Sequence, residues 1–205
     1  MQPHEIEQLS FEIIDREAGH HGFAADQWPV VRRVIHTSAD FEWLTMIRIH
    51  PEAVSAGITA IRGGCTIVTD TNMARVGIRQ RDLSRFGGTV TCHMSDARVA
   101  ESARREGTTR ARAAVELAAP NLSGGIYVVG NAPTALLRLI ELIDQGRAAP
   151  ALVVGVPVGF VKAAESKALL LKSGVASITN LGRKGGSTVA AAVVNALILM
   201  AGADR

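Results

Sequence analysis

The run Gly125-Ile126-Tyr127-Val128-Val129-Gly130 leads directly into Asn131-Ala132-Pro133-Thr134, and this junction decides the fold. Four apolar or aromatic residues bounded by glycine are typical of a strand that is buried on both faces, as in a parallel sheet. Proline favours the first turn of a helix. The junction therefore predicts a buried strand followed at once by a helix, the basic unit of an α/β protein.

Four further apolar runs alternate with helical patterns along the chain. They lie at residues 65–69, 89–94, 151–156 and 175–179. Strands that alternate with helices form βαβ units, which require a parallel sheet covered on both sides. We therefore predict an α/β fold with a doubly wound, mainly parallel five-stranded sheet and helices on both faces. Ligands of such sheets bind at the carboxyl ends of the strands, so the loops there are the first place to look for a site.

Composition narrows the class of protein further. A chain of 205 residues can bury a sizeable core, and we predict a single domain over residues 1–205. The formal net charge is only +3 and 4% of the residues are aromatic, which argues against a nucleic-acid partner. Cys65 and Cys92 have neither metal-site nor disulfide-framework spacing, so we expect buried, reduced thiols. The polar N-terminus and the absence of a long apolar run predict a cytoplasmic protein without membrane contact.

His36 is the strongest candidate for acid–base chemistry. It ends an apolar helical pattern through Val31 and Val34, and the short polar residues Thr37, Ser38 and Asp40 follow it. Imidazole titrates near pH ~6.5 and is the usual general acid or base in enzymes. These polar neighbours could fix its tautomer. The alternative is that His36 only interacts favourably with the negative end of the helix dipole.

Several polar residues are candidates for ligand binding. Arg33 lies three residues before His36, which predicts that both share one helix face. Ser10 lies on or beside the apolar face of a predicted helix over residues 6–17, where a bond to its own helix is the common alternative. Thr109 and Arg110 begin another helix after a glycine, and the arginine could pair with a carboxylate or simply be solvated.

Two glycine loops precede predicted helices. The free N–H groups around Asn131 can bind an anion, and a purely structural turn is an equally open alternative. The loop Gly182-Arg183-Lys184-Gly185-Gly186-Ser187 lacks phosphate-loop spacing, which excludes a nucleoside triphosphate site, but its backbone could hold carboxylates. The sequence contains no GxGxxG fingerprint, metal cluster or GxSxG elbow. It predicts one proton donor and polar anchors for an acidic ligand, with no cofactor and no metal.

An ordered set of motifs runs through nearly the whole chain. The set comprises Ser10-Phe11 with Ile13-Ile14, Val34-Ile35-His36, Asp70-Thr71 with Met73, Asn131-Ala132-Pro133-Thr134-Ala135-Leu136, Pro157-Val158-Gly159-Phe160-Val161, Ala163-Ala164-Glu165-Ser166-Lys167 and Gly185-Gly186-Ser187. In these motifs the chain resembles the precorrin-8X methylmutase family of cobalamin biosynthesis, including its cobalt-precorrin-8 branch.

The resemblance implies a flavodoxin-like fold, a homodimer and an isomerase. The enzyme would move a methyl group from carbon 11 to carbon 12 of precorrin-8X or cobalt-precorrin-8, which gives hydrogenobyrinic or cobyrinic acid. The family's histidine falls on His36, which would protonate the macrocycle. Ser10, Arg33, Thr109 and Arg110 match positions that the family uses for substrate, a corrinoid polycarboxylate. From their places in the strand-end loops, we add Asn131 as a polar contact and Met73, Val158 and Phe160 as packing for the ring face.

Two other functions remain open at this point. The first is a non-catalytic tetrapyrrole-binding or carrier protein on the same fold, in which His36 is structural or ligates the bound molecule. The second is a small flavodoxin-like nucleotide enzyme, which the missing phosphate-binding spacings oppose. His36→Ala separates the first from catalysis, because a catalyst would lose turnover and keep its ligand.

Overall fold

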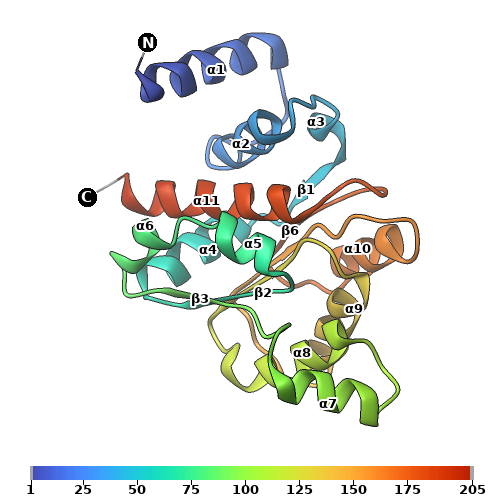
Figure 1. The fold of residues 1–205 in the computed structure, drawn as a ribbon. Helices are drawn as coiled ribbons and strands as arrows, with labels where there is room; N and C mark the ends of the chain where they lie inside the picture. The colour runs from blue at the N-terminus through green and yellow to red at the C-terminus, as the bar shows by residue number, and fades with distance from the viewer. Residues whose placement is uncertain (1, 204–205) are drawn as a thin grey trace.

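A six-stranded sheet lies between helical layers in the computed structural model of the protein, which describes residues 2–203 (Figure 1). Residues 1, 204 and 205 of the predicted domain lie outside the described residues. Every neighbouring pair of strands is parallel except the pair of β1 with β6. The order across the sheet is β1 (Ile47–Ile49), β6 (Ser177–Asn180), β5 (Leu152–Gly155), β4 (Ile126–Val129), β2 (Thr66–Thr69) and β3 (Thr89–Thr91).

The prediction of a five-stranded sheet is wrong by one strand. The additional strand, β1, has three residues and pairs antiparallel with β6, so that Ile47 lies opposite Asn180. Three residues are too short for a recognisable alternation, and only the tertiary contact with β6 makes them a strand. The five predicted strands are all present. The strand expected at residues 89–94 is shorter, because β3 ends at Thr91.

Helices cover both faces of the sheet, as the sequence predicts. Ile126 and Val128 of β4 pack into the core under α11, whereas Tyr127 and Val129 pack into the core on the opposite face. The helices are α1 (Pro3–Ala18), α2 (Trp28–Ser38), α3 (Trp43–Met46), α4 (Ala53–Arg62), α5 (Asn72–Gly77), α6 (Gln80–Ser84), α7 (Ala97–Arg105), α8 (Arg110–Ala118), η1 (Ala119–Asn121), α9 (Pro133–Asp144), α10 (Ala163–Lys172) and α11 (Ser187–Gly202).

On the α11 face of the sheet, helices are stacked in more than one layer (Figure 1). Helix α11 is apolar nearly all round, and its buried residues pack against α2, α4 and α5. Helix α1 lies outside α2, so that α1, α2 and α11 are stacked above the sheet (Figure 1). The stacking places the predicted histidine helix, α2, between the core and α1.

The remaining sequence expectations concern the cysteines and membranes. Cys65 and Cys92 are free, but both are half-buried rather than buried. Burial raises the pKa of the Cys65 thiol to about 11, so this thiol is protonated at neutral pH.

No helix within residues 2–203 has the length and apolar character needed to cross a membrane.

Candidate active site

A buried carboxylate organises the carboxyl edge of the sheet. Asp70 follows β2 and is only 2% exposed. Its carboxylate accepts hydrogen bonds from the backbone N–H groups of Gly130 (2.9 Å), Asn131 (2.8 Å) and Ala132 (2.7 Å). Burial raises the pKa of Asp70, and these three bonds oppose that rise. The carboxylate therefore ties the end of β2 to the loop that follows β4.

Of the two alternatives for these N–H groups, a ligand anion or a purely structural turn, the structure supports the structural turn. Asp70 of the same chain already occupies them. The donors at the start of a helix do attract an anion, as expected, but the anion comes from the neighbouring strand. The sequence alone does not reveal that β2 and β4 are neighbours. The Asn131 side chain itself is exposed and remains a candidate for substrate binding.

The loop that follows β6 reaches the same carboxyl edge of the sheet, where α11 begins at Ser187. The hydroxyl groups of Thr71 and Ser187 lie 2.8 Å apart, and Thr71 also caps α5 by accepting a bond from the N–H of Ala74. Met73, in the first turn of α5, is 65% exposed beside this contact. The predicted contact through the second glycine loop is limited, because the N–H of Gly186 donates to the carbonyl of Val156 (3.0 Å).

Thr109 and Arg110 lie at the start of α8, next to the start of α9. The Thr109 hydroxyl caps α8 and lies 3.1 Å from the hydroxyl of Thr134 in the first turn of α9. Arg110 is exposed, and no carboxylate of residues 2–203 forms an ion pair with it. Because α9 begins just after Asn131, the fold brings Thr109, Arg110 and Asn131 to one region. We call Met73, Thr109, Arg110 and Asn131 the strand-end cluster.

His36 lies in a second group of candidates, formed by α1 and α2. Its exposed imidazole contacts the edge of the Phe11 ring, with centroids 5.2 Å apart. The Arg33 guanidinium lies over the same ring at 5.1 Å and pairs with Glu7 at 3.1 Å. Ser10 donates its hydroxyl to the carbonyl of Ile6 at 2.8 Å. We call Ser10, Phe11, Arg33 and His36 the α1–α2 cluster.

The immediate surroundings of His36 differ in part from the prediction. Arg33 and His36 do share one side of α2, as their spacing predicts, and Phe11 supports both. The role of Phe11 was missed, because only the packing of α1 on α2 creates it. Two of the three expected tautomer partners are engaged elsewhere: Ser38 donates to the carbonyl of Val34, and Asp40 accepts a bond from Lys184.

One ion-pair network connects the end of α2 to the strand ends. The Lys184 ammonium lies 2.5 Å from Asp40 and 2.8 Å from Glu42, and it holds the pKa of Asp40 below its ordinary value. Lys184 belongs to the loop between β6 and α11, whereas Asp40 and Glu42 follow α2. Among the described residues, no hydrogen bond or ion pair joins the α1–α2 cluster directly to the strand-end cluster.

A buried lysine supports the loop between β6 and α11. Lys167 of α10 is 1% exposed, and its ammonium donates to the carbonyl of Lys184 (2.7 Å) and the side-chain oxygen of Asn180 (3.2 Å). The Asn180 amide donates to the same Lys184 carbonyl at 2.9 Å. In the sequence, Lys167 stands out only as part of a motif. The sequence gives no sign of its burial, because lysine is almost never fully buried.

The burial of Lys167 predicts how the stability of the fold depends on pH. Burial lowers the pKa of Lys167 to about 8. The unfolded chain keeps this proton to about pH 10.4, so between about pH 8 and 10 the unfolded state binds more protons than the folded state. Stability from this group therefore rises with pH, by at most about 1.4 kcal/mol per pH unit. In urea denaturation at pH 7 to 10, wild type should gain stability relative to Lys167→Met. The exposed-site variant Lys172→Met should show the wild-type profile, and parallel profiles for wild type and Lys167→Met would contradict the prediction.

The chain is similar to known proteins over nearly its whole length. The family model described as "CbiC: Precorrin-8X methylmutase" matches residues 5–200. The chain is 50% identical to a cobalt-precorrin-8 methylmutase of Priestia megaterium, over 98% of this chain and 89% of that protein. It is 40% identical to a precorrin-8X methylmutase of Pseudomonas aeruginosa, over 94% and 93% of the two chains.

A solved structure agrees with these sequence matches. It is titled as a crystal analysis of precorrin-8X methyl mutase from Thermus thermophilus, and it superposes with a TM-score of 0.90 at 48% identity. The superposition covers 97% of this chain and 96% of that one. The similarity therefore extends over the six-stranded sheet and both clusters of candidate residues.

Proposed function

Because this chain belongs to the precorrin-8X methylmutase family, we propose that it moves a methyl group from carbon 11 to carbon 12 of its corrinoid substrate with His36 as the proton donor. The protein is a methylmutase, an isomerase of cobalamin biosynthesis. The observation that supports His36 most is its place at the end of α2, where it is exposed to solvent and packed on Phe11 beside Arg33.

The chemistry needs an acid more than any other group. A methyl shift around a conjugated macrocycle redistributes π electrons without adding or removing atoms. An imidazolium that donates a proton to the ring system makes the ring more electron-deficient and thereby eases migration, a form of general acid catalysis worth about 10²–10⁴-fold. Because substrate and product are isomers, the donated proton returns within the same turnover. No cofactor is required for this sequence of steps.

The two clusters supply anchors for an acidic macrocycle. Arg33 and Arg110 provide planar donor groups for its carboxylates, and Thr109 and Asn131 provide neutral donors. Ser10 contributes only if its hydroxyl leaves the Ile6 carbonyl. Met73 offers an exposed apolar surface to the ring face.

We further propose that the protein is a single-domain, cytoplasmic homodimer. In one chain, α1 leaves Ile6 52% exposed and Leu9 44% exposed. A second copy would remove such apolar side chains from water. Sedimentation at a mass of two chains would support the dimer, and a monomer at every concentration would contradict it.

Arg110→Ala is expected to weaken binding of hydrogenobyrinic acid about tenfold, because it removes a charge-assisted bond to a carboxylate. Titration followed by absorbance measures the dissociation constant. Arg104→Ala, another exposed arginine outside the clusters, serves as the control and should bind like wild type. Equal affinities for all three proteins would remove Arg110 from the site.

The function is tested by anaerobic incubation of the purified protein with precorrin-8X and, separately, with cobalt-precorrin-8. Absorbance spectroscopy and mass spectrometry follow the products. We expect a changed spectrum and an unchanged mass for at least one of the two substrates. Recovery of both substrates unrearranged, with only a spectral shift of the bound ligand, would contradict catalysis and favour a carrier.

A further inference from the structure

Two loops at the carboxyl edge of the sheet are joined into one element. One runs from residue 156 to 162, between β5 and α10, and the other from 181 to 186, between β6 and α11. The N–H of Gly159 donates to the carbonyl of Arg183 (3.1 Å), and that of Gly186 donates to the carbonyl of Val156 (3.0 Å). A side chain at Gly185 would lie 2.2 Å from the Val156 carbonyl oxygen, so only glycine allows this approach. We call these segments the paired loops.

The paired loops present apolar side chains to solvent. In the 156–162 segment Phe160 is 84% exposed, Val161 79% and Val158 43%, and in the 181–186 segment Leu181 is 41% exposed. Apolar side chains gathered on one exposed element are typical of a binding surface. The buried Lys167 donates to the Lys184 carbonyl and so fixes the backbone of the 181–186 segment beneath this surface.

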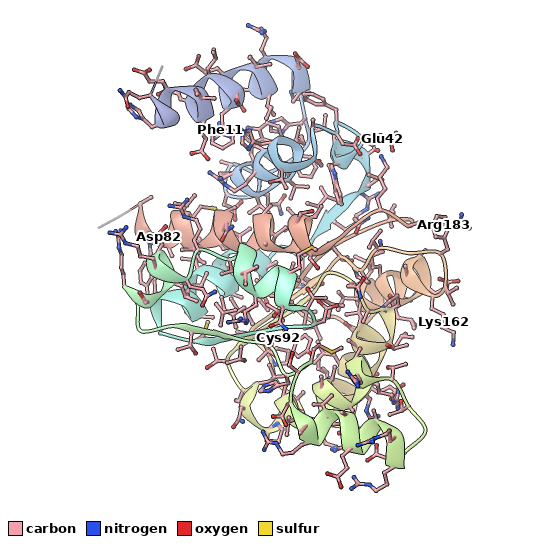
Figure 2. The ribbon with its side chains drawn as sticks, viewed as in Figure 1. Phe11, Glu42, Asp82, Cys92, Lys162 and Arg183 are labelled. Atoms are coloured by element: carbon pink, nitrogen blue, oxygen red, sulfur yellow. The ribbon has the colours of Figure 1, made fainter. Side chains whose placement is uncertain are left out.

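Cations accompany this apolar surface. The Arg183 guanidinium lies 5.4 Å from the centre of the Phe160 ring. Lys162 is exposed and has a left-handed backbone conformation with φ of 59°, a strain that residues keep at functional sites more often than elsewhere. No carboxylate within the described part of the chain forms an ion pair with either residue. Figure 2 shows Lys162 and Arg183 on the same side of the molecule.

We propose that the paired loops form a specificity surface for the macrocycle, in which Phe160 packs on an apolar ring face and Arg183 binds a rim carboxylate. The inference rests on the proposed function and deepens it. An extended conjugated ring with acidic arms matches an aromatic side chain flanked by unpaired cations. A guanidinium stacked on an aromatic ring keeps its in-plane N–H groups free to donate to a carboxylate.

A second copy of this chain is the competing occupant. In a symmetric dimer the same patch meets itself. Contact through the paired loops would then place Arg183 and Lys162 of both copies in one interface, and within the described residues neither cation has an ion-pair partner in its own chain, which makes such a contact unfavourable. The charges therefore favour an acidic ligand at this surface.

The test compares wild type with Phe160→Ala and Arg183→Gln. The dissociation constant of hydrogenobyrinic acid is measured by absorbance titration at two salt concentrations. We expect Phe160→Ala to bind about tenfold more weakly, because apolar contact area is lost. Arg183→Gln should bind several-fold more weakly with a smaller salt dependence. The control is Leu169→Ala, an exposed apolar residue of α10 outside the paired loops, which should bind like wild type.

Two results would overturn the inference. In the first, Phe160→Ala and Arg183→Gln bind within twofold of wild type. In the second, Phe160→Ala loses affinity only because its dimer dissociates in sedimentation, which would assign the surface to a second copy. A wild-type protein that neither binds nor rearranges the substrate would refute the proposed function and this inference together, whereas wild-type turnover with unaffected variants would refute the inference alone.

Discussion

His36→Ala is expected to lower kcat for the methyl shift by about 10²–10⁴-fold, with the ligand still bound. His36 is exposed at the end of α2, so its removal should leave the fold intact. Its ring contributes one edge contact with Phe11, and the carboxylate anchors lie on other residues. The loss should therefore appear in kcat far more than in the dissociation constant of the product.

His20→Ala is the matched control for this experiment. His20 is also exposed but lies outside both clusters, so its removal should leave kcat unchanged. Anaerobic steady-state assays and product titration on the same preparations separate kcat from affinity. If His36→Ala kept kcat within tenfold of wild type, another group would have to donate the proton.

Asp70→Asn is expected to lower the free energy of unfolding by about 2–3 kcal/mol. The three N–H donors use both carboxylate oxygens of Asp70. An amide has only one oxygen, so in either orientation at least one buried N–H faces an NH2 group and loses its acceptor. Each such loss costs about 1–3 kcal/mol, and the bonds to a charged acceptor are also weakened.

Thermal unfolding followed by circular dichroism measures this effect. For a domain of this size, 1 kcal/mol shifts Tm by about 2–4 °C, so Asp70→Asn should lower Tm by roughly 4–12 °C. The control is Asp144→Asn, an exposed residue at the end of α9, which should change stability by no more than about 0.5 kcal/mol. An unchanged Tm for Asp70→Asn would show that the three N–H groups do not need the carboxylate.

The layers of the fold were accessible to sequence reasoning, but the pairing of elements was not. The apolar run of β4 correctly predicted burial on both faces, because each of its side chains packs into one of two cores. The three residues of β1 carry no such pattern and form a strand only through β6. Strand order likewise cannot be read from local sequence.

The candidate site shows the same division between local and tertiary information. Arg33 and His36 share one helix, so their spacing predicted that they lie together, as they do on Phe11. Asp70 and Asn131 are far apart in the chain and meet only because β2 and β4 are neighbours. Spacing could identify the donors around Asn131, but it could not identify the carboxylate that occupies them.

The position of the migrated methyl group tests the central claim most directly. Precorrin-8X that carries a ¹³C-labelled methyl group at carbon 11 and a second ¹³C label in the macrocycle itself is mixed with unlabelled substrate and converted anaerobically. The product is analysed by NMR and by mass spectrometry, in which exchange of methyl groups between molecules would appear as singly labelled product. We predict that wild type gives the ¹³C methyl at carbon 12 with no exchange of label between molecules, and that His36→Ala gives almost none. Label that remains at carbon 11 with wild type, or label that exchanges between molecules, would contradict an intramolecular methyl shift by this protein.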